Sequence, residues 1–177
     1  AIAADQGVGV SVYSYESDFS SIWSPASIGL STIGAEEEST PVSLLCAVDA
    51  DATFAHDYYY CAFGRTWEGA EAFCAVSGMH LVSIADASEN ALVLGLLGTS
   101  YAYIGASDSA AEGTWTWSDG TTWTWTDTAT DLWNAGEPNN SGNEDCAMMI
   151  DSSSPSAGLW NDVPCTATYP FVCESAD

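Results

Sequence analysis

The sequence contains almost no positive charge. Its 177 residues include 25 aspartates and glutamates but only one lysine or arginine, Arg65, and the formal net charge is −24. A surface of this sign repels phosphate backbones and anionic lipid headgroups, because nothing on it neutralises them. We therefore expect no nucleic-acid partner and no membrane insertion, and a surface that attracts cations instead.

The sequence also lacks a long apolar run and a C-x-x-C cysteine pair. The first absence argues against a transmembrane span, and the second against zinc ribbons and thioredoxin-like redox sites. The chain starts at Ala1 without a methionine or a basic leader, so we expect a mature, secreted form. Six cysteines favour an oxidised framework of disulfides outside the cytosol, although their spacing leaves the pairing open.

The sequence divides into two parts that differ in their residue pattern. Apolar residues make up 47% of the chain, which is enough for a packed core. Residues 1–45 combine a strand-like alternation in "GVGVSVYSY" with serine-rich turns and an acidic knot at 36–38. We expect a strand- and loop-rich extension over 1–45, suited to self-assembly, followed by one domain over 46–177.

The pattern of the domain predicts an α+β fold. "VSLLCAV" (42–48) is typical of a buried strand, and strands are also expected at 58–64 and 80–84. Helices are predicted over 66–78 and 86–98, the second capped by Asp86 or Ser88. Short strands and loops follow, at 113–120, 121–127, 146–150, 158–165 and 169–173. Helices first and strands afterwards favour the α+β class.

One loop concentrates acidic and amide groups. "EPNNSGNEDC" (137–146) places two glutamates, one aspartate and three asparagines within ten residues. These oxygens repel one another unless a cation lies among them. The loop ends a stretch from about 107 to 145 that is long for a compact domain, which points to function or to an external clamp such as a metal.

Several motifs occur in an order that resembles a C-type lectin-like domain over about 46–174. They are "CAFGRTWEGAEAFC", "HLVSI", "YIGASD", "GTWTWSDG", "W..GEPNN", "EDCAMMI", "GLWNDVPC" and "PFVC". The resemblance implies two helices packed on short antiparallel sheets, with a long calcium-binding loop region and disulfide staples. It also implies the pairs Cys74–Cys173 and Cys146–Cys165, with Cys46–Cys61 as the additional bridge of the long form.

The resemblance further implies two calcium sites built from oxygen donors, which Ca²⁺ prefers. The primary ligands would be Glu137, Asn139, Glu144, Asn161 and Asp162, with the Asp162 carbonyl oxygen as a further donor. The auxiliary ligands would be Asp108, Glu112, Asn140 and Asp145. Pro138 is expected to follow a cis peptide bond, which turns the side chains on either side of it toward the same ion.

Sugar binding is implied at the primary site. Glu137, Asn139, Glu144 and Asn161 would hydrogen-bond two neighbouring sugar hydroxyls, the carboxylates accepting and the amides donating. In the family, E-P-N goes with mannose-type sugars and Q-P-D with galactose. The expected partners are therefore glycans that carry mannose, fucose, glucose or N-acetylglucosamine.

Three other functions compete with this one. A glycosidase would use Glu137 and Glu144 as its carboxylate pair, but nothing nearby suggests the apolar pocket that raises one pKa, so we expect no enzyme. The threonine-rich "TWTWSDGTTWTWTDTAT" is compatible with ice binding, since some fish antifreeze proteins share the fold. Residues 1–45 are compatible with an extracellular fibre or layer of homo-oligomers.

Aromatic residues and histidines receive structural interpretations. Trp67, Trp117 and Trp160 match scaffold positions and are expected in the core. Trp123, Trp125 and Trp133 are expected to pack under the long loop. His80 fits a structural role and His56 lies in a linker, so neither is assigned to metal binding or catalysis.

Overall fold

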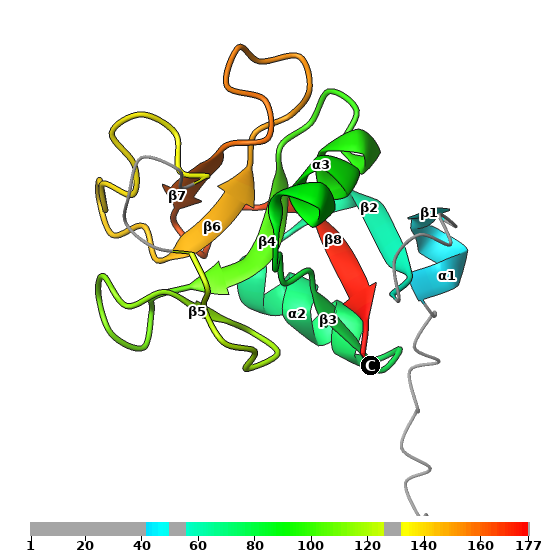
Figure 1. Cartoon of the computed structure of the whole chain (residues 1–177). Helices are drawn as coiled ribbons and strands as arrows, with labels where there is room; N and C mark the ends of the chain where they lie inside the picture. Colours follow the sequence, from blue (N-terminus) through cyan, green and yellow to red (C-terminus); the bar gives the residue numbers. More distant parts are fainter. Residues whose placement is uncertain (1–41, 50–55, 126–131, 177) are drawn as a thin grey trace, which may run out of the picture. The chain divides into compact units, whose positions relative to one another are not determined.

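The computed structural model describes residues 42–49, 56–125 and 132–176, all within one compact unit (Figure 1). In chain order the elements are α1 (Val42–Leu45), β1 (Ala47–Asp49), β2 (Tyr58–Arg65), α2 (Trp67–Ala75), β3 (Met79–Leu81), α3 (Ala87–Leu96), β4 (Ala102–Ser107), β5 (Thr116–Trp117), β6 (Cys146–Met149), β7 (Trp160–Val163) and β8 (Tyr169–Ser175). The predicted α+β class with two principal helices is confirmed. The predictions for residues 1–41 lie outside the described residues.

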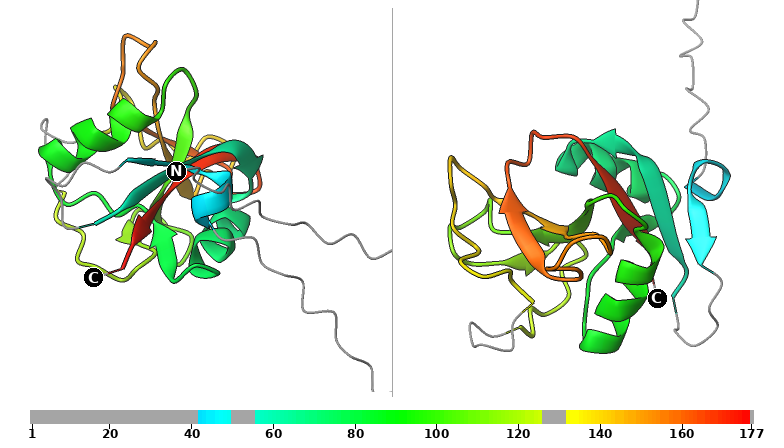
Figure 2. Two further views of the ribbon diagram at one scale, coloured as in Figure 1. Left: turned by 90° about the vertical axis from the view of Figure 1, so that its right-hand side faces the viewer. Right: turned by 90° about the horizontal axis from the view of Figure 1, so that it is seen from above.

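The strands follow the order β1-β2-β8-β4-β6-β7, with β3 paired to β8 and β5 to β4. Neighbouring strands are antiparallel except for β4 and β8. Figures 1 and 2 show α1, β1 and β2 at one end of the molecule and β5, β6, β7 with the long loop at the other. The W-N-D sequence of β7 therefore lies on the terminal strand, beside the acidic loop.

Capping residues set where the two helices begin. The Thr66 side chain accepts a hydrogen bond from the Gly69 amide at the start of α2. Asp86 accepts from the amides of Ser88 and Glu89 at the start of α3. These contacts satisfy amides that have no partner within the helix. Of the two predicted caps of the second helix, Asp86 is therefore the residue that performs the function.

The strand predicted over 42–48 is wrong in its first half. Val42–Leu45 forms a helical turn, which the hydrogen bond from the Cys46 amide to the Val42 carbonyl closes at 2.9 Å, and the strand covers only Ala47–Asp49. A short apolar run has no periodicity that separates a strand from a buried helical turn. Val42 is fully buried, but Leu45 and Val48 are about half exposed, so the expected burial of the run holds only in part.

The three disulfides have the pairing that the resemblance implied. Cys46 joins Cys61, Cys74 joins Cys173 and Cys146 joins Cys165, and no described cysteine is free. The bond from α2 to β8 closes a loop of 99 residues. In the chain-entropy account each bridge contributes about 2–4 kcal/mol, which suits a domain with long loops.

A cluster of tryptophans packs the long loop onto β7. Trp160 is fully buried, and its ring centroid lies 5.8 Å from that of Trp117 and 5.5–6.1 Å from those of Trp123, Trp125 and Trp133. The expected core positions of Trp117 and Trp160 and the expected packing of the other three are confirmed. Such aromatic contacts add to the burial of apolar area and hold the loop against β7.

The third predicted core tryptophan, Trp67, is only half-buried. Its indole N–H donates to the Ile104 carbonyl at 2.9 Å and joins α2 to β4. Its role in the scaffold is therefore to connect these two elements.

Candidate metal centre

The E-P-N segment is held in a fixed conformation. The Glu137–Pro138 peptide bond is cis, as expected, and the Asn139 side-chain amide donates to the Glu137 carboxylate. The Glu137 amide donates to the Asn134 carbonyl at 2.9 Å. The two polar side chains that flank the proline therefore lie together.

Asp162 connects the W-N-D strand to this segment. Its side chain is buried, and its Oδ2 atom accepts the backbone N–H groups of Asn139 at 2.9 Å and Asn140 at 2.7 Å. Its Oδ1 atom is buried without a hydrogen-bond partner among the described residues. A buried carboxylate oxygen without a partner is costly, and a cation is the natural partner for it.

Glu144 and Asn161 complete the expected primary set. The Glu144 amide donates to Asn140 Oδ1 at 2.7 Å, and Glu144 Oε2 accepts from the Ser141 amide at 3.0 Å. Asn161 Nδ2 donates to the Asp162 carbonyl at 2.8 Å. That carbonyl oxygen keeps a second lone pair, so the bond does not prevent it from binding a cation.

The expected auxiliary residues lie next to the primary ones. Asp108 is 3% exposed; its Oδ2 atom accepts from the Gly113 amide at 2.8 Å, and its Oδ1 atom has no partner among the described residues. The Asp108 amide donates to the Asp145 carbonyl at 3.1 Å. Glu112 accepts from Asn140 Nδ2 at 2.5 Å. Each of the two expected sites thus contains a buried carboxylate oxygen that has no partner among the described residues.

Crowding of carboxylates raises several pKa values in this region. Burial, and then the neighbouring Asp162 carboxyl, raise the pKa of Glu137. Burial and the charge of Asp145 raise the pKa of Asp108, and burial with the charge of Asp108 raises that of Glu112. A divalent cation would reverse these shifts, because it favours the ionised form of every carboxylate around it.

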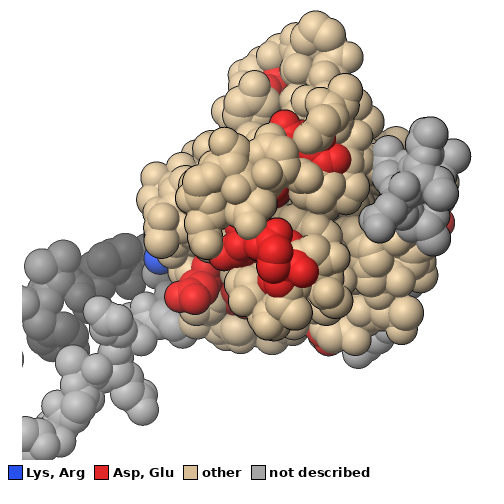
Figure 3. Space-filling model, turned by 90° about the vertical axis from the view of Figure 1, so that its left-hand side faces the viewer, with Lys and Arg blue, Asp and Glu red and all other residues tan. Residues whose placement is uncertain are grey.

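No lysine or arginine side chain neutralises these carboxylates. The chain has no lysine, and Arg65 lies over the rings of Phe63 and Phe73, 5.5 and 4.9 Å from their centroids. Figure 3 shows aspartate and glutamate side chains gathered on the face that carries the long loop. Within the described residues, histidine, cysteine and carboxylate side chains alone form no metal-binding group, so a site here also needs amide and carbonyl oxygens. That mixed oxygen set suits Ca²⁺.

Sequence reasoning missed the residues that position the auxiliary carboxylates. Ser107 Oγ donates to the Asp145 carbonyl at 2.7 Å, and Asn143 Nδ2 donates to Asp145 Oδ2 at 2.8 Å. Asn143 has φ of 74°, a conformation that asparagine tolerates better than most residues. The high number of asparagines in the acidic loop was the only feature of the sequence that pointed to this positioning of Asp145.

The disulfide-linked α+β fold, with E-P-N and W-N-D motifs joined at one end, defines a C-type lectin-like domain. The profile of the Lectin C-type domain matches residues 64–175, and the chain belongs to this family. No helix among the described residues reaches the length and apolar character needed to cross a bilayer.

Individual relatives agree with this assignment. The human C-type lectin domain family 4 member K is 36% identical over 117 residues, which cover 66% of this chain and 35% of that relative. The chain thus spans about a third of the length of this curated relative.

Two solved structures share the fold. The carbohydrate-recognition domain of the mouse scavenger receptor C-type lectin superimposes with a TM-score of 0.60 at 31% identity, covering 69% of this chain and 89% of that one. A calcium-independent type II antifreeze protein superimposes with a TM-score of 0.62 at 28% identity, covering 73% and 96%.

Proposed function

We propose that this domain binds carbohydrate in a calcium-dependent manner. The primary calcium ligands would be Glu137, Asn139, Glu144, Asn161 and Asp162, and the auxiliary ligands Asp108, Glu112, Asn140 and Asp145. The observation that carries the proposal is the Asp162 carboxylate, which holds the E-P-N backbone with one oxygen and leaves the other buried and unpartnered among the described residues. Family membership supports a lectin function in place of catalysis.

The residues of this chain would then recognise the sugar directly. Calcium, when bound, supplies open coordination positions for two neighbouring hydroxyl oxygens. Glu137 and Glu144 accept hydrogen bonds from those hydroxyls, whereas the amides of Asn139 and Asn161 donate to them. Each hydroxyl is then both donor and acceptor, which fixes the orientation of the sugar ring.

The order of groups in E-P-N sets the expected specificity. An acid followed by an amide suits the equatorial 3- and 4-hydroxyls of mannose-type sugars, so we propose mannose, fucose, glucose or N-acetylglucosamine as the terminal residue. Asn139 is exposed, which indicates a shallow site. One monosaccharide in such a site is expected to bind at about millimolar concentration, or about 4 kcal/mol, so effective binding needs several copies.

A mannan column tests the proposal. The full chain should be retained in calcium and released by a chelator. The double variant Glu137→Gln/Asn139→Asp should move retention from mannose to galactose, because the donor and acceptor positions change places. Glu68→Gln, at an exposed position of α2, is the matched control and should behave as the wild type. Retention that survives the chelator would overturn the mechanism.

Two further parts of the proposal concern secretion and self-assembly, and the second has its own test. The three disulfides support secretion into an oxidising compartment. Assembly through residues 1–45 rests on the sequence pattern alone, because most of that segment lies outside the described residues. If that segment drives assembly, the chain sediments as a large particle even with chelator present. A small particle under those conditions would remove this part of the proposal.

Ice binding is the second candidate function. The likeness to a calcium-independent type II antifreeze protein favours it, and that likeness is one of fold. Thermal hysteresis in a solution of the purified protein would support ice binding. Its absence at high protein concentration would exclude it and leave the lectin proposal unaffected.

A further inference from the structure

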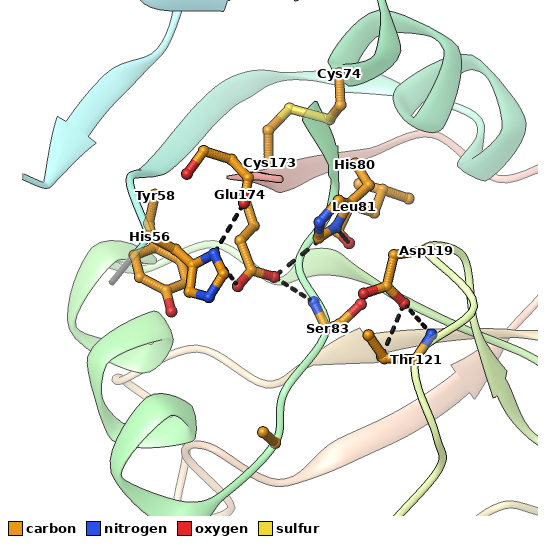
Figure 4. A network of polar contacts seen from close by, with 12 residues as sticks. His56, Tyr58, Cys74, His80, Leu81, Ser83, Asp119, Thr121, Cys173 and Glu174 are labelled. Carbon is orange, nitrogen blue, oxygen red and sulfur yellow. Dashed lines mark hydrogen bonds and ion pairs between the residues drawn. A yellow bond between two sulfur atoms is a disulfide. The ribbon is translucent and has the colours of Figure 1, made fainter. Parts of the chain in front are cut away.

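A pocket with several charged side chains in its lining lies away from the candidate metal centre, and none of the expected calcium ligands lines it. It has a volume of about 490 Å³ and lies between the start of β2, β3, the N-terminal end of α3, the 117–124 loop and the end of β8. The residues that line it come from distant parts of the sequence. Figure 4 shows several of their polar contacts.

Glu174 of β8 lines this pocket. Its side chain is buried; Oε2 accepts from the Ser83 amide at 2.9 Å and lies 3.8 Å from His80 Nδ1. Oε1 lies 3.6 Å from His56 Nδ1. A buried carboxylate normally has a permanent positive charge beside it. Within the described part of the chain, the only basic side chains near this carboxylate are the two histidines, because Arg65 lies over the rings of Phe63 and Phe73.

Three other carboxylates also line the pocket, and hydrogen bonds hold them in fixed positions. Glu89 accepts from the Tyr58 hydroxyl and the Ala85 amide, both at 2.7 Å. Asp119 accepts from the Thr121 amide at 2.9 Å and from its hydroxyl at 2.8 Å. With Asp86 and Glu174 the pocket presents four carboxylates and neither lysine nor arginine. The field inside it therefore favours a cation.

A buried hydroxyl gives an independent indication of a ligand. Ser83 is 8% exposed, and its Oγ atom has no hydrogen-bond partner among the described residues. The residue lines the pocket, and Figure 4 shows it between Glu174 and Asp119. Buried polar atoms in folded proteins are almost always paired. An incoming donor would supply the partner that this oxygen lacks.

We propose that this pocket binds a small organic ammonium ion, such as an alkylamine or the side chain of a lysine from a partner. The N–H groups of a primary ammonium match the carboxylate oxygens and the unpaired Ser83 hydroxyl. Tyr58 and Trp117, which are 1% and 4% exposed, also line the pocket. The volume accommodates a short alkyl chain together with the charged group.

The pocket gives this binding a defined pH dependence. Burial is the main cause that raises the pKa of Glu174 to about 7; the charge of Glu89 acts in the same direction, whereas the Ser83 amide and the two histidines act against it. The titratable groups that face Glu174 are His56 before β2, Tyr58 on β2, His80 on β3, Asp86 and Glu89 at the start of α3, and Asp119 in the loop. Acidification protonates Glu174, and the loss of this negative charge opposes the binding of a cation. Affinity should therefore fall as the pH drops from about 8 to about 5.5.

Butylammonium is the direct probe, with uncharged 1-butanol as its matched control. We would titrate both into the full chain in saturating calcium and follow the Ser83 amide and the Trp117 indole N–H by NMR. Butylammonium should shift both signals saturably, at a concentration at least tenfold lower than 1-butanol. A lysine-containing peptide and its Nε-acetylated form show whether the ammonium group can come from a protein.

Variants make the proposal falsifiable. Glu174→Gln keeps an acceptor for the Ser83 amide and should weaken butylammonium binding at least tenfold without changing sugar binding. If Glu174→Gln fails to fold, Asp119→Asn serves as the alternative test. This variant, in the loop, should also weaken butylammonium binding. Glu68→Gln should change nothing. Equal binding of 1-butanol, shifts confined to the 137–146 loop, or unchanged binding in folded Glu174→Gln would each overturn the proposal.

Discussion

The buried carboxylate of Asp162 accepts the backbone N–H of Asn139 at 2.9 Å. This bond joins β7 to the E-P-N loop across 23 residues of sequence. The same oxygen also accepts from Asn140, whereas the other oxygen has no partner among the described residues. One side chain thus joins the two motifs and has one buried oxygen without a partner among the described residues.

Replacement of Asp162 by asparagine should separate these two functions. In the Asp162→Asn variant the side-chain carbonyl oxygen can still accept the two backbone N–H groups, but the negative charge is lost. We expect calcium affinity to fall by about tenfold to hundredfold or more, and retention on mannan to disappear. Isothermal titration calorimetry with calcium measures the change.

Asp151→Asn is the control for that variant. Asp151 is also buried, and it accepts from the amide and hydroxyl of Ser153 outside the candidate metal centre. Its substitution should leave calcium affinity unchanged. A similar loss of affinity in both variants would show that the effect comes from general destabilisation.

Calcium should stabilise the folded domain by mass action. At a calcium concentration about one hundred times the dissociation constant, the free energy of unfolding should rise by about 2.7 kcal/mol. Calorimetric scans of the wild type should show a midpoint several degrees higher in calcium than in chelator. Asp162→Asn should show little change between the two conditions, and an unchanged midpoint in the wild type would count against the site.

Glu174 should make the domain less stable as the pH rises. Its pKa is raised from 4.5 to about 7 in the folded protein, mainly by burial, so the folded state binds this proton more tightly than the unfolded chain. The contribution is fully present below about pH 4.5 and is lost as the pH approaches 7 and above, on the order of 2–3 kcal/mol. Denaturation curves across this range measure the loss.

The variant Glu174→Gln isolates that contribution from the other carboxylates. The free energy of unfolding of the variant should vary less with pH between about 4.5 and 7 than that of the wild type. Glu68→Gln, on the exposed side of α2, should follow the wild type. Parallel curves for the wild type and Glu174→Gln would mean that the carboxyl is not perturbed.

Gly105 occupies a position where the backbone of β4 approaches the end of β3 and the residue that follows it. A Cβ atom there would lie 2.6 Å from the Leu81 carbonyl oxygen and 3.1 Å from that of Val82. Gly105→Ala must therefore displace backbone, and we expect it to cost about 1–3 kcal/mol of stability. A Cβ atom at Gly95 in α3 would meet no other atom within 4 Å, so Gly95→Ala should stabilise by about 0.5–1 kcal/mol. Urea denaturation distinguishes the two outcomes, and equal effects would refute the steric argument.

The sequence predicted the elements whose local signals agree with one another. Asp86 precedes an apolar run that ends at Gly98, and the structure begins α3 directly after this cap. The 42–48 segment failed because its apolar residues suit a strand and a buried turn equally, and only the packing of Val42 and the Cys46–Cys61 bond distinguishes them. Local chemistry was sufficient where a cap or a motif marked the boundary.

The two polar sites differ in how far the sequence predicted them. Glu137, Asn139 and Asp162 belong to motifs, so their proximity was expected from the resemblance before the structure showed it. His56, His80 and Glu174 are separated by many residues. His56 and Glu174 belong to none of the motifs, and His80, the first residue of HLVSI, had only a structural interpretation. Their contacts depend on the pairing of β3 and β2 with β8, which the spacing of residues did not specify.

A crystal structure of the full chain in millimolar calcium tests the central claim most directly. We predict a density peak between the side chains of Glu137 and Asp162, with oxygen ligands at about 2.3–2.6 Å that include Asp162 Oδ1. An ordered loop with its hydrogen bonds intact and no peak at that position would contradict the account.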